Sequence, residues 1–138
     1  MIYHGIDIIE IDRIKRATGR WGMRFLQRVY TIGELHDCDT SGPTPHYQSL
    51  AARWAAKEAV AKALGVGLSG IAAATTPDSR PRMCDIEVVR DADGRPTLRL
   101  HGPAAATATA LGIAEMALSL SHSGGIAVAS VVAISVDS

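Results

Sequence analysis

The stretch that decides the fold is LAARWAAKEAVAKALG, residues 50–65. Its alanines, leucines, lysines and other strong helix formers predict one helix, and Gly65 stands where a left-handed residue commonly ends a helix. At about 100° per residue the apolar side chains fall on two sides. One side holds Leu50, Trp54, Ala61 and Leu64, and the other holds Ala52, Ala56, Ala59 and Ala63. A helix with two apolar sides is normally buried on both, and the alanine side favours close packing against a sheet or another chain.

The same helix also carries charges, which are unusual in so apolar a segment. They are Arg53, Lys57, Glu58 and Lys62. Like charges four residues apart, as in Arg53 and Lys57, destabilise an isolated helix by about a few tenths of a kcal/mol, and an anion between them would reverse the sign. Glu58 and Lys62 have the spacing of an ion pair. Two interpretations stay open: a solvated stripe with one salt bridge, or a site with three cations for phosphate and one carboxylate for a metal.

A second carboxylate for such a site stands near the start of the chain. Residues 2–11, IYHGIDIIEI, are rich in β-branched side chains and predict a strand. Asp7 lies inside this segment between isoleucines, where a carboxylate must be paired, hydrogen-bonded or bound to a metal. The alternative is an Asp that caps local backbone. Asp12 is expected to start the following helix.

Residues 12–29 form the most basic part of the chain and predict one or two short helices that break or kink at Gly19 and Gly22. The basic side chains are Arg13, Lys15, Arg16, Arg20, Arg24 and Arg28. Such a face suits an acidic partner through electrostatic steering, and a merely solvated face is the alternative. Thr31 and Glu34 have the spacing of a capping box, so a short helix is expected to begin there.

The rest of the chain mixes strands, helices and loops without regular strand–helix–strand alternation. The expected elements are loops over 37–46 and 65–83, a hairpin over 85–100 with its turn at 91–94, a helix over 103–111, and strands over 116–121 and 126–136. This order predicts an α+β fold with antiparallel pairing. His122 is expected in the connection between the last two strands, where Ser121, Ser123 and two glycines could help it hold a phosphate. A plain surface histidine is the alternative.

Length and composition exclude several classes of protein. The 138 residues fit a single domain over 1–138. The formal net charge of zero argues against general binding to nucleic acid or membrane surfaces. The sequence shows neither a secretory signal nor an apolar window long enough to span a membrane, so we expect a soluble cytoplasmic protein. Cys38 and Cys84 have no spacing typical of a zinc site or a disulfide framework.

Five segments occur in an order that resembles the holo-acyl-carrier-protein synthases, the small bacterial family of 4′-phosphopantetheinyl transferases. The segments are GIDIIEIDRI, VYTIGEL, ARWAAKEAVAKALG, DIEVVRDADGRPTLRL and SLSHSGGIAVASVV, which together span essentially the whole chain. The resemblance implies an α+β phosphopantetheinyl transferase fold, with an antiparallel sheet packed on the long central helix. It also implies a homotrimer with active sites between neighbouring subunits.

The resemblance further implies an activity. The family moves 4′-phosphopantetheine from coenzyme A to a serine of apo acyl carrier protein, releases adenosine 3′,5′-bisphosphate, requires Mg²⁺ and serves fatty acid biosynthesis. The implied metal ligands are Asp7 and Glu58. The implied coenzyme A contacts are Arg53, Lys57, Lys62, Gly65, Ser121 and His122, and the implied catalytic residues are Asp7, Glu58, Lys62 and His122. The implied carrier-protein contacts are Arg13, Arg24 and Arg28.

Two other functions remain open at this point: a coenzyme A-binding protein without transfer activity, and a trimeric interaction module whose charges are interface salt bridges. Relatives often carry an acidic residue after the histidine, whereas this chain has Ser123. For a transferase, the expected base for the serine proton is Glu58 acting through a metal-bound water. His122 is the alternative base, although a phosphate contact is its expected role.

Overall fold

The structure, a computed structural model, describes residues 1–68 and 80–136. Its elements in chain order are β1 (Ile2–Glu10), α1 (Ile11–Trp21), α2 (Met23–Val29), α3 (Ile32–Asp37), α4 (Tyr47–Leu64), η2 (Met83–Asp85), β2 (Ile86–Arg90), β3 (Pro96–Leu100), α5 (Gly102–Ala110), β4 (Ile113–Ser123) and β5 (Ile126–Ser135). The described strands form one sheet in the order β1–β5–β4 and one hairpin, β2–β3, and all their pairings are antiparallel. The predicted α+β class is therefore confirmed.

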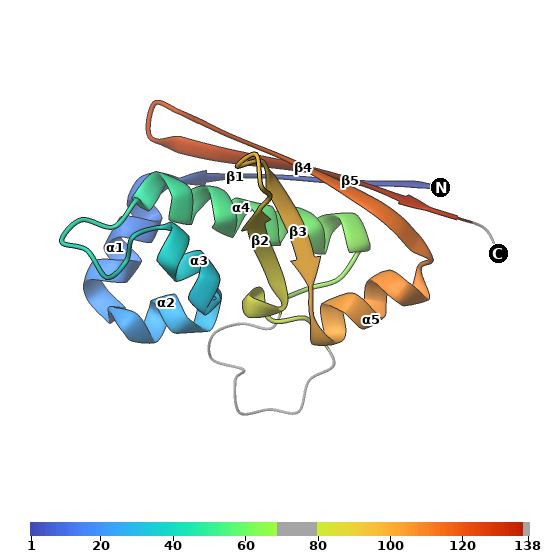
Figure 1. The fold of residues 1–138 in the computed structure, drawn as a ribbon, viewed down its shortest axis with the longest axis horizontal. Helices are drawn as coiled ribbons and strands as arrows, with labels where there is room; N and C mark the ends of the chain where they lie inside the picture. Colours follow the sequence, from blue (N-terminus) through green and yellow to red (C-terminus); the bar gives the residue numbers. More distant parts are fainter. Residues whose placement is uncertain (69–79, 137–138) are drawn as a thin grey trace.

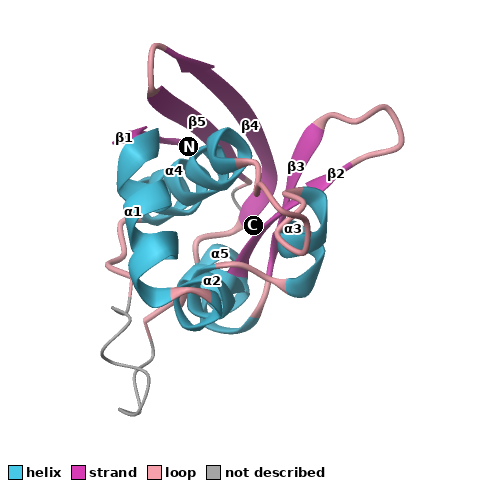
Figure 2. Ribbon diagram, turned by 90° about the vertical axis from the view of Figure 1, so that its left-hand side faces the viewer, coloured by secondary structure: helices cyan, strands magenta, loops and turns pink. Residues whose placement is uncertain are grey.

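The helix α4 lies along the three-stranded sheet, and the β2–β3 hairpin crosses α4 (Figure 1). The short helices α1, α2 and α3 gather around one end of α4, whereas α5 lies toward its other end (Figure 1). Turned by 90°, the molecule shows the β4–β5 ribbon and the β2–β3 hairpin as separate arms beside the helices (Figure 2). α4 is thus covered by the sheet on one side and by the hairpin and short helices on others.

The alanine side of α4 packs directly on β1 and β5, so of the two partners predicted for it, a sheet or another chain, the structure shows the sheet. The closest approach is at Gly5 of β1. A Cβ atom placed on Gly5 would stand 1.9 Å from the carbonyl oxygen of Ala59 and 2.8 Å from the backbone nitrogen of Ala63. Real Cβ atoms do not approach backbone this closely, so only glycine fits at this position.

The helix ends agree with the sequence analysis at one terminus and differ at two others. Gly65 is left-handed, with φ of 70°, and ends α4 as predicted. α4 begins at Tyr47, three residues before the predicted start. The prediction that Asp12 starts α1 is wrong, because the helix begins at Ile11. Asp12 lies in the first turn instead and pairs with Arg16 at 2.9 Å.

Three other local predictions are confirmed. The capping box at Thr31 and Glu34 is present, the 85–100 segment is a hairpin, and the helix α5 has proline in its first turn. Of the two predicted breaks in the basic segment, Gly22 separates α1 from α2 with φ of 58°, whereas Gly19 lies inside α1. The predicted loop over 65–83 falls largely on residues 69–79, which lie outside the described residues.

The last two strands are longer than predicted. β4 continues through His122, which pairs with Ala127 of β5, so His122 belongs to a strand and not to the connection. The turn consists of Gly124 and Gly125 alone, with φ of 56° and 82°. Two consecutive residues with positive φ match the favoured twist of a two-residue hairpin turn, and this lets the ladder continue to Ser123.

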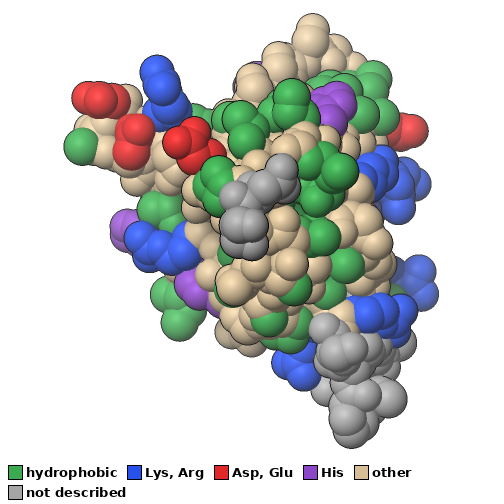
Figure 3. All heavy atoms as spheres, turned by 90° about the vertical axis from the view of Figure 1, so that its right-hand side faces the viewer, with side chains coloured by type: hydrophobic (Ala, Val, Ile, Leu, Met, Phe, Trp, Pro, Cys, Tyr) green, Lys and Arg blue, Asp and Glu red, His purple; other side chains and the backbone are tan. Residues whose placement is uncertain are grey.

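The sheet face opposite α4 stays exposed and is largely apolar. Because side chains alternate along a strand, the residues next to buried Gly5 and Ile9 point away from α4. We call this the outer sheet face; its large apolar members are Ile2, Ile6, Ile8, Ile126, Val132 and Ile134. Hydrophobic side chains are also visible at the end of the molecule that carries both termini (Figure 3). Within the described ranges, no helix has both the length and the apolar composition of a membrane span.

The substitution Gly5→Ala tests the closest contact in the fold. We expect it to lower the free energy of unfolding by about 1–3 kcal/mol or more, because the added methyl group meets helix backbone that cannot turn aside. Urea unfolding at a fixed protein concentration measures the change. The control is Gly19→Ala, where a Cβ meets nothing within 4 Å and should add about 0.5–1 kcal/mol of helix stability. Equal stability of the Gly5→Ala variant and the unchanged protein would contradict this packing.

Candidate active site

A pair of carboxylates lies where β1 meets the C-terminal half of α4. Asp7 points toward α4, on the same side of β1 as Gly5, and its Oδ1 atom lies 3.0 Å from the Nζ atom of Lys62. Lys62 also donates to the carbonyl oxygen of Ile6 at 2.9 Å. Lys62, whose spacing from Glu58 also allows an ion pair within the helix, therefore pairs with Asp7 across the helix–strand interface.

Glu58 lies close enough to Asp7 for the charge of Asp7 to change its pKa. Burial raises the pKa of Glu58 above its usual value, the negative charge of Asp7 raises it further, and Lys62 and Arg13 oppose the shift. Without a cation, the ionised form of Glu58 is thus less favourable at this position than it is in water. The structure brings Asp7, Glu58 and Lys62 together, as the sequence analysis expected.

The carboxylate pair fits a hard divalent cation. Among residues 1–68 and 80–136, no three His, Cys, Asp or Glu side chains group as a metal site. Mg²⁺, however, needs only one or two carboxylates when phosphate oxygens and water complete its octahedron. Two carboxylates whose mutual repulsion raises the pKa of Glu58 supply such a donor set. The repulsion also gives a cation an electrostatic reason to bind there.

A cationic cavity of about 240 Å³ lies on the other flank of α4. We call it the arginine pocket; its polar lining includes Gln48, Ser49, Arg53, Arg90, Ser121 and His122. Arg53 is only 2% exposed, and it donates to the carbonyl oxygen of Ser49 at 3.4 Å and lies 3.7 Å from a carboxylate oxygen of Asp37. Its buried Nε atom has no hydrogen-bond partner among the described residues. Buried donors are almost always paired, so this guanidinium is suited to a further acceptor such as a phosphate oxygen.

Arg90 is the residue of the arginine pocket that the sequence analysis missed. It ends β2 and donates to the carbonyl oxygen of Gly94 within its own hairpin. A cation before a turn is ordinary in a sequence. Only the crossing of the hairpin over α4 places Arg90 beside Arg53 and His122, and no local pattern signals that crossing.

Lys57 does not belong to the arginine pocket, although we predicted it as a phosphate contact. Its side chain is fully buried, and its Nζ atom donates to Glu34 at 2.7 Å and to the carbonyl oxygens of Met83 and Ile86. In this conformation all three N–H groups of Lys57 are engaged within the protein, and its role as a phosphate contact stays a prediction.

The carboxylate pair and the arginine pocket lie on opposite flanks of α4. Asp7 belongs to β1 and His122 to β4, and β5 runs between these two edge strands. Two steps between neighbouring strands span about 10 Å of backbone. Along α4, Arg53 and Lys62 are nine residues apart, which places them about half a turn apart around the helix axis. The carboxylate pair and the arginine pocket, which we call the two half-sites, therefore face different directions. Gly65 lies just beyond the end of α4 that carries Lys62.

The basic helices begin beside the carboxylate pair. Arg13, Arg24 and Arg28 are exposed on α1 and α2, as expected for a charged docking face. The charge of Arg13 lowers the pKa of Glu58, which shows that the start of α1 lies near that carboxylate. Trp21 and Met23 lie at the junction of the two helices and are each about half exposed. The surface therefore combines positive charge with apolar contact area.

Comparison with known proteins gives a consistent family assignment. The family model of the 4′-phosphopantetheinyl transferase superfamily matches residues 4–129. The holo-[acyl-carrier-protein] synthase of Chloroflexus aggregans is 57% identical over 133 residues, covering 96% of this chain and 95% of the relative. That of Dehalococcoides mccartyi is 45% identical, covering 96% of this chain and 98% of the relative.

Solved structures agree with this assignment. The holo-[acyl-carrier-protein] synthase of Neisseria meningitidis has a TM-score of 0.79 at 31% identity, covering 97% of this chain and 99% of that one. The Helicobacter pylori enzyme in complex with coenzyme A has a TM-score of 0.75 at 30% identity, covering 97% and 100%. This chain therefore shares both sequence and fold with these proteins over nearly its full length.

Replacing Glu58 by Gln should raise the thermal midpoint at about pH 7.5 in the presence of a chelator. The folded pKa of Glu58 lies above the unfolded value, so the stability given by its protonated form is complete below about pH 4 and is lost as pH rises through the folded pKa. Above that range ionised Glu58 destabilises the fold, and Gln removes this cost. Thermal melts at about pH 7.5 and at about pH 4 measure the shift of the midpoint, which should be smaller at about pH 4.

The matched control is Asp93→Asn, which changes an exposed carboxylate in the hairpin turn. We expect no shift of its thermal midpoint at either pH. A Glu58→Gln variant that melts below the unchanged protein at about pH 7.5 would contradict the electrostatic account of the carboxylate pair.

Proposed function

The chain belongs to the 4′-phosphopantetheinyl transferase superfamily, and from this membership we propose how its two half-sites carry out the reaction. The enzyme transfers 4′-phosphopantetheine from coenzyme A to a serine of an apo acyl carrier protein. The single observation that carries the site assignment is the carboxylate pair of Asp7 and Glu58, in which Lys62 of α4 forms an ion pair with Asp7 of β1.

The bond changes define what the site must do. The serine oxygen forms a bond to the phosphorus that carries the pantetheine, and the bond from that phosphorus to the bridging oxygen of the diphosphate breaks. The leaving group is adenosine 3′,5′-bisphosphate. The serine proton must leave as the new bond forms, and we assign Glu58 as its acceptor through an intervening water molecule.

Asp7 and Glu58 are the residues that would hold Mg²⁺ in this proposal. The ion, when bound, would neutralise charge on the phosphoryl oxygens of the substrate. Lys62 would donate to the diphosphate from the same flank of α4, because its side chain is about half exposed while it pairs with Asp7. Gly65 would leave space for the substrate beside the end of the helix.

The arginine pocket would take the remaining phosphate of coenzyme A, the one on the 3′ position of its ribose. Arg53 and Arg90 supply planar, permanently charged donors, which suit phosphate oxygens better than a single ammonium does. His122 lines the same cavity from β4, and Ser121 adjoins it. The buried, unpartnered Nε atom of Arg53 supports this assignment.

A homotrimer with active sites between subunits follows from the same proposal. One coenzyme A molecule must reach the carboxylate pair and an arginine pocket, yet the two half-sites of one chain face apart. In a closed ring built from head-to-tail contacts, each chain can offer its carboxylate pair to one neighbour and its arginine pocket to the other. The exposed apolar outer sheet face supports such an assembly, since large exposed apolar patches mark interfaces.

The basic surface of α1 and α2 would bind the carrier protein. A basic face suits an acidic partner, so Arg13, Arg24 and Arg28 would give the charge complementary to an acidic carrier protein. Arg13 also lines a cavity of about 240 Å³ with Ile8, Ile9, Glu10 and Ile126. Since Arg13 lies near Glu58, a carrier docked on α1 would bring its serine toward the carboxylate pair.

The test is the intact mass of a purified apo acyl carrier protein after incubation with this enzyme, coenzyme A and Mg²⁺. We expect a mass gain of one phosphopantetheine, and Asp7→Asn should slow it by about 100-fold or more because one ligand and the partner of Lys62 are lost. Asp93→Asn, which changes an exposed carboxylate in the hairpin turn outside both the carboxylate pair and the basic surface, is the matched control and should keep the rate.

Two outcomes would overturn parts of the proposal. If Asp7→Asn modifies the carrier as fast as the unchanged enzyme, the metal assignment is wrong. If coenzyme A binds with Mg²⁺ but no carrier protein in a panel gains mass, the chain is a coenzyme A-binding protein without transfer activity.

A further inference from the structure

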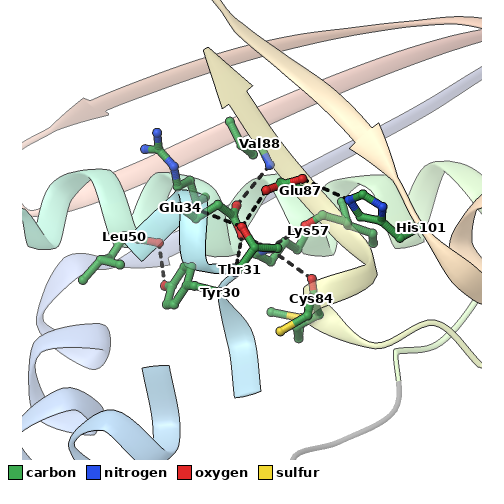
Figure 4. Close-up of polar contacts among 12 residues, drawn as sticks. Tyr30, Thr31, Glu34, Leu50, Lys57, Cys84, Glu87, Val88 and His101 are labelled. Atoms are coloured by element: carbon green, nitrogen blue, oxygen red, sulfur yellow. Dashed lines mark hydrogen bonds and ion pairs between the residues drawn. The ribbon is translucent and has the colours of Figure 1, made fainter. Parts of the chain in front are cut away.

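A fully buried ion pair links three segments of the fold beside the arginine pocket. Lys57 of α4 and Glu34 of α3 are both completely buried, and their charged atoms lie 2.7 Å apart (Figure 4). Burial lowers the pKa of Lys57, and the charge of Glu34 opposes the shift. A buried ion pair seldom adds stability beyond what two apolar side chains of similar volume would give. We therefore ask which parts of the fold this ion pair holds in place.

Lys57 fixes the start of β2 against α4. Its other two N–H groups donate to the carbonyl oxygens of Met83, at 3.0 Å, and Ile86. These carbonyl groups belong to η2 and to the first residue of β2. Lys57 thus connects the middle of α4 to η2 and the first residue of β2.

Glu34 fixes the same strand two residues further on. One carboxylate oxygen accepts from Lys57 and from the backbone nitrogen of Thr31, and the other accepts from the backbone nitrogen of Val88 at 3.0 Å. A second carboxylate, Glu87, accepts from the hydroxyl group of Thr31 at 2.7 Å and contacts His101. Figure 4 shows these contacts converging between α3, α4 and β2.

The two arginines of the pocket lie just beyond the points that this pair fixes. Arg53 precedes Lys57 by one helical turn on α4, about 6 Å along the axis. Arg90 follows Val88 by two residues on β2, about 7 Å along the strand. The separation of the two guanidinium groups is therefore set by where the Lys57–Glu34 pair holds β2 against α4.

We propose that Lys57 and Glu34 are positioning residues for the arginine pocket, and that they confer selectivity for coenzyme A bearing a 3′-phosphate. This inference rests on the proposed function, in which that phosphate lies between Arg53 and Arg90. Neither residue touches the substrate. Their effect passes through β2, whose small displacement would separate two donors that must meet one phosphate group.

The experiment compares transfer from coenzyme A with transfer from dephospho-coenzyme A, which lacks only the 3′-phosphate. The variant is the double substitution Lys57→Met, Glu34→Gln. It removes the buried charges together, so neither is left unpaired, and the amide oxygen at position 34 can still accept from Val88. We expect KM for coenzyme A to rise about tenfold with kcat nearly unchanged, and the preference over dephospho-coenzyme A to fall by a similar factor.

The control for general destabilisation is Tyr30→Phe. It removes a buried hydrogen bond of 2.7 Å from the hydroxyl group to the carbonyl oxygen of Leu50, and this bond does not involve the hairpin. We expect a lower thermal midpoint with unchanged preference between the two donors. If the double variant likewise loses stability but keeps the preference, Lys57 and Glu34 are merely structural and the inference is wrong.

A third variant separates this inference from the proposed function. Arg90→Gln removes a pocket cation directly and should lower the preference for coenzyme A over dephospho-coenzyme A. If Arg90→Gln loses the preference and the double variant keeps it, only the positioning role fails. If the unchanged enzyme shows no preference, the assignment of the arginine pocket to the 3′-phosphate fails, although transfer itself still stands.

Discussion

The close contact between α4 and the sheet at Gly5 is the constraint on which the rest of the structure depends. The side of α4 toward the sheet carries methyl groups and β1 carries no side chain at the contact, so helix and strand backbones nearly touch. No functional group fits between them. Charged side chains of α4 can therefore leave the helix only on the sides that do not face the sheet. Glu58 and Lys62 lie at the carboxylate pair and Arg53 at the arginine pocket, whereas Lys57 is buried against Glu34.

The second constraint is the attachment of β2 to α4 and α3. Strand β2 is held against α4 by Lys57 and Glu34 through carbonyl and amide groups of its backbone. Backbone contacts of this kind fix the path of a strand whatever its side chains are. The chain thus uses two buried charges to place Arg53 and Arg90 at the arginine pocket, in the same helix and hairpin that contribute to the core.

The sequence was sufficient to predict features that depend on neighbouring residues, and insufficient to predict contacts between elements that are distant in the chain. Hydrophobic periodicity and Gly65 located α4, and a carboxylate among isoleucines identified Asp7. The i, i+4 spacing of Arg53 and Lys57 could not show that Glu34, from another element, takes Lys57 into the core. Glu34 itself was predicted only as a capping residue. Arg90 became part of the site through the crossing of a hairpin over a helix, and His122 entered a strand because two glycines make a two-residue turn.

The central claim is that one active site takes its carboxylate pair from one chain and its arginine pocket from a neighbour. The direct test is complementation between two inactive variants, Asp7→Asn and Arg53→Glu, produced together in one cell and purified as mixed assemblies. If the site is shared, about a quarter of the unchanged transfer rate should return, since an interface is intact only when the two chains meet in one order. Activity no greater than that of the two variants assayed separately would contradict the shared site.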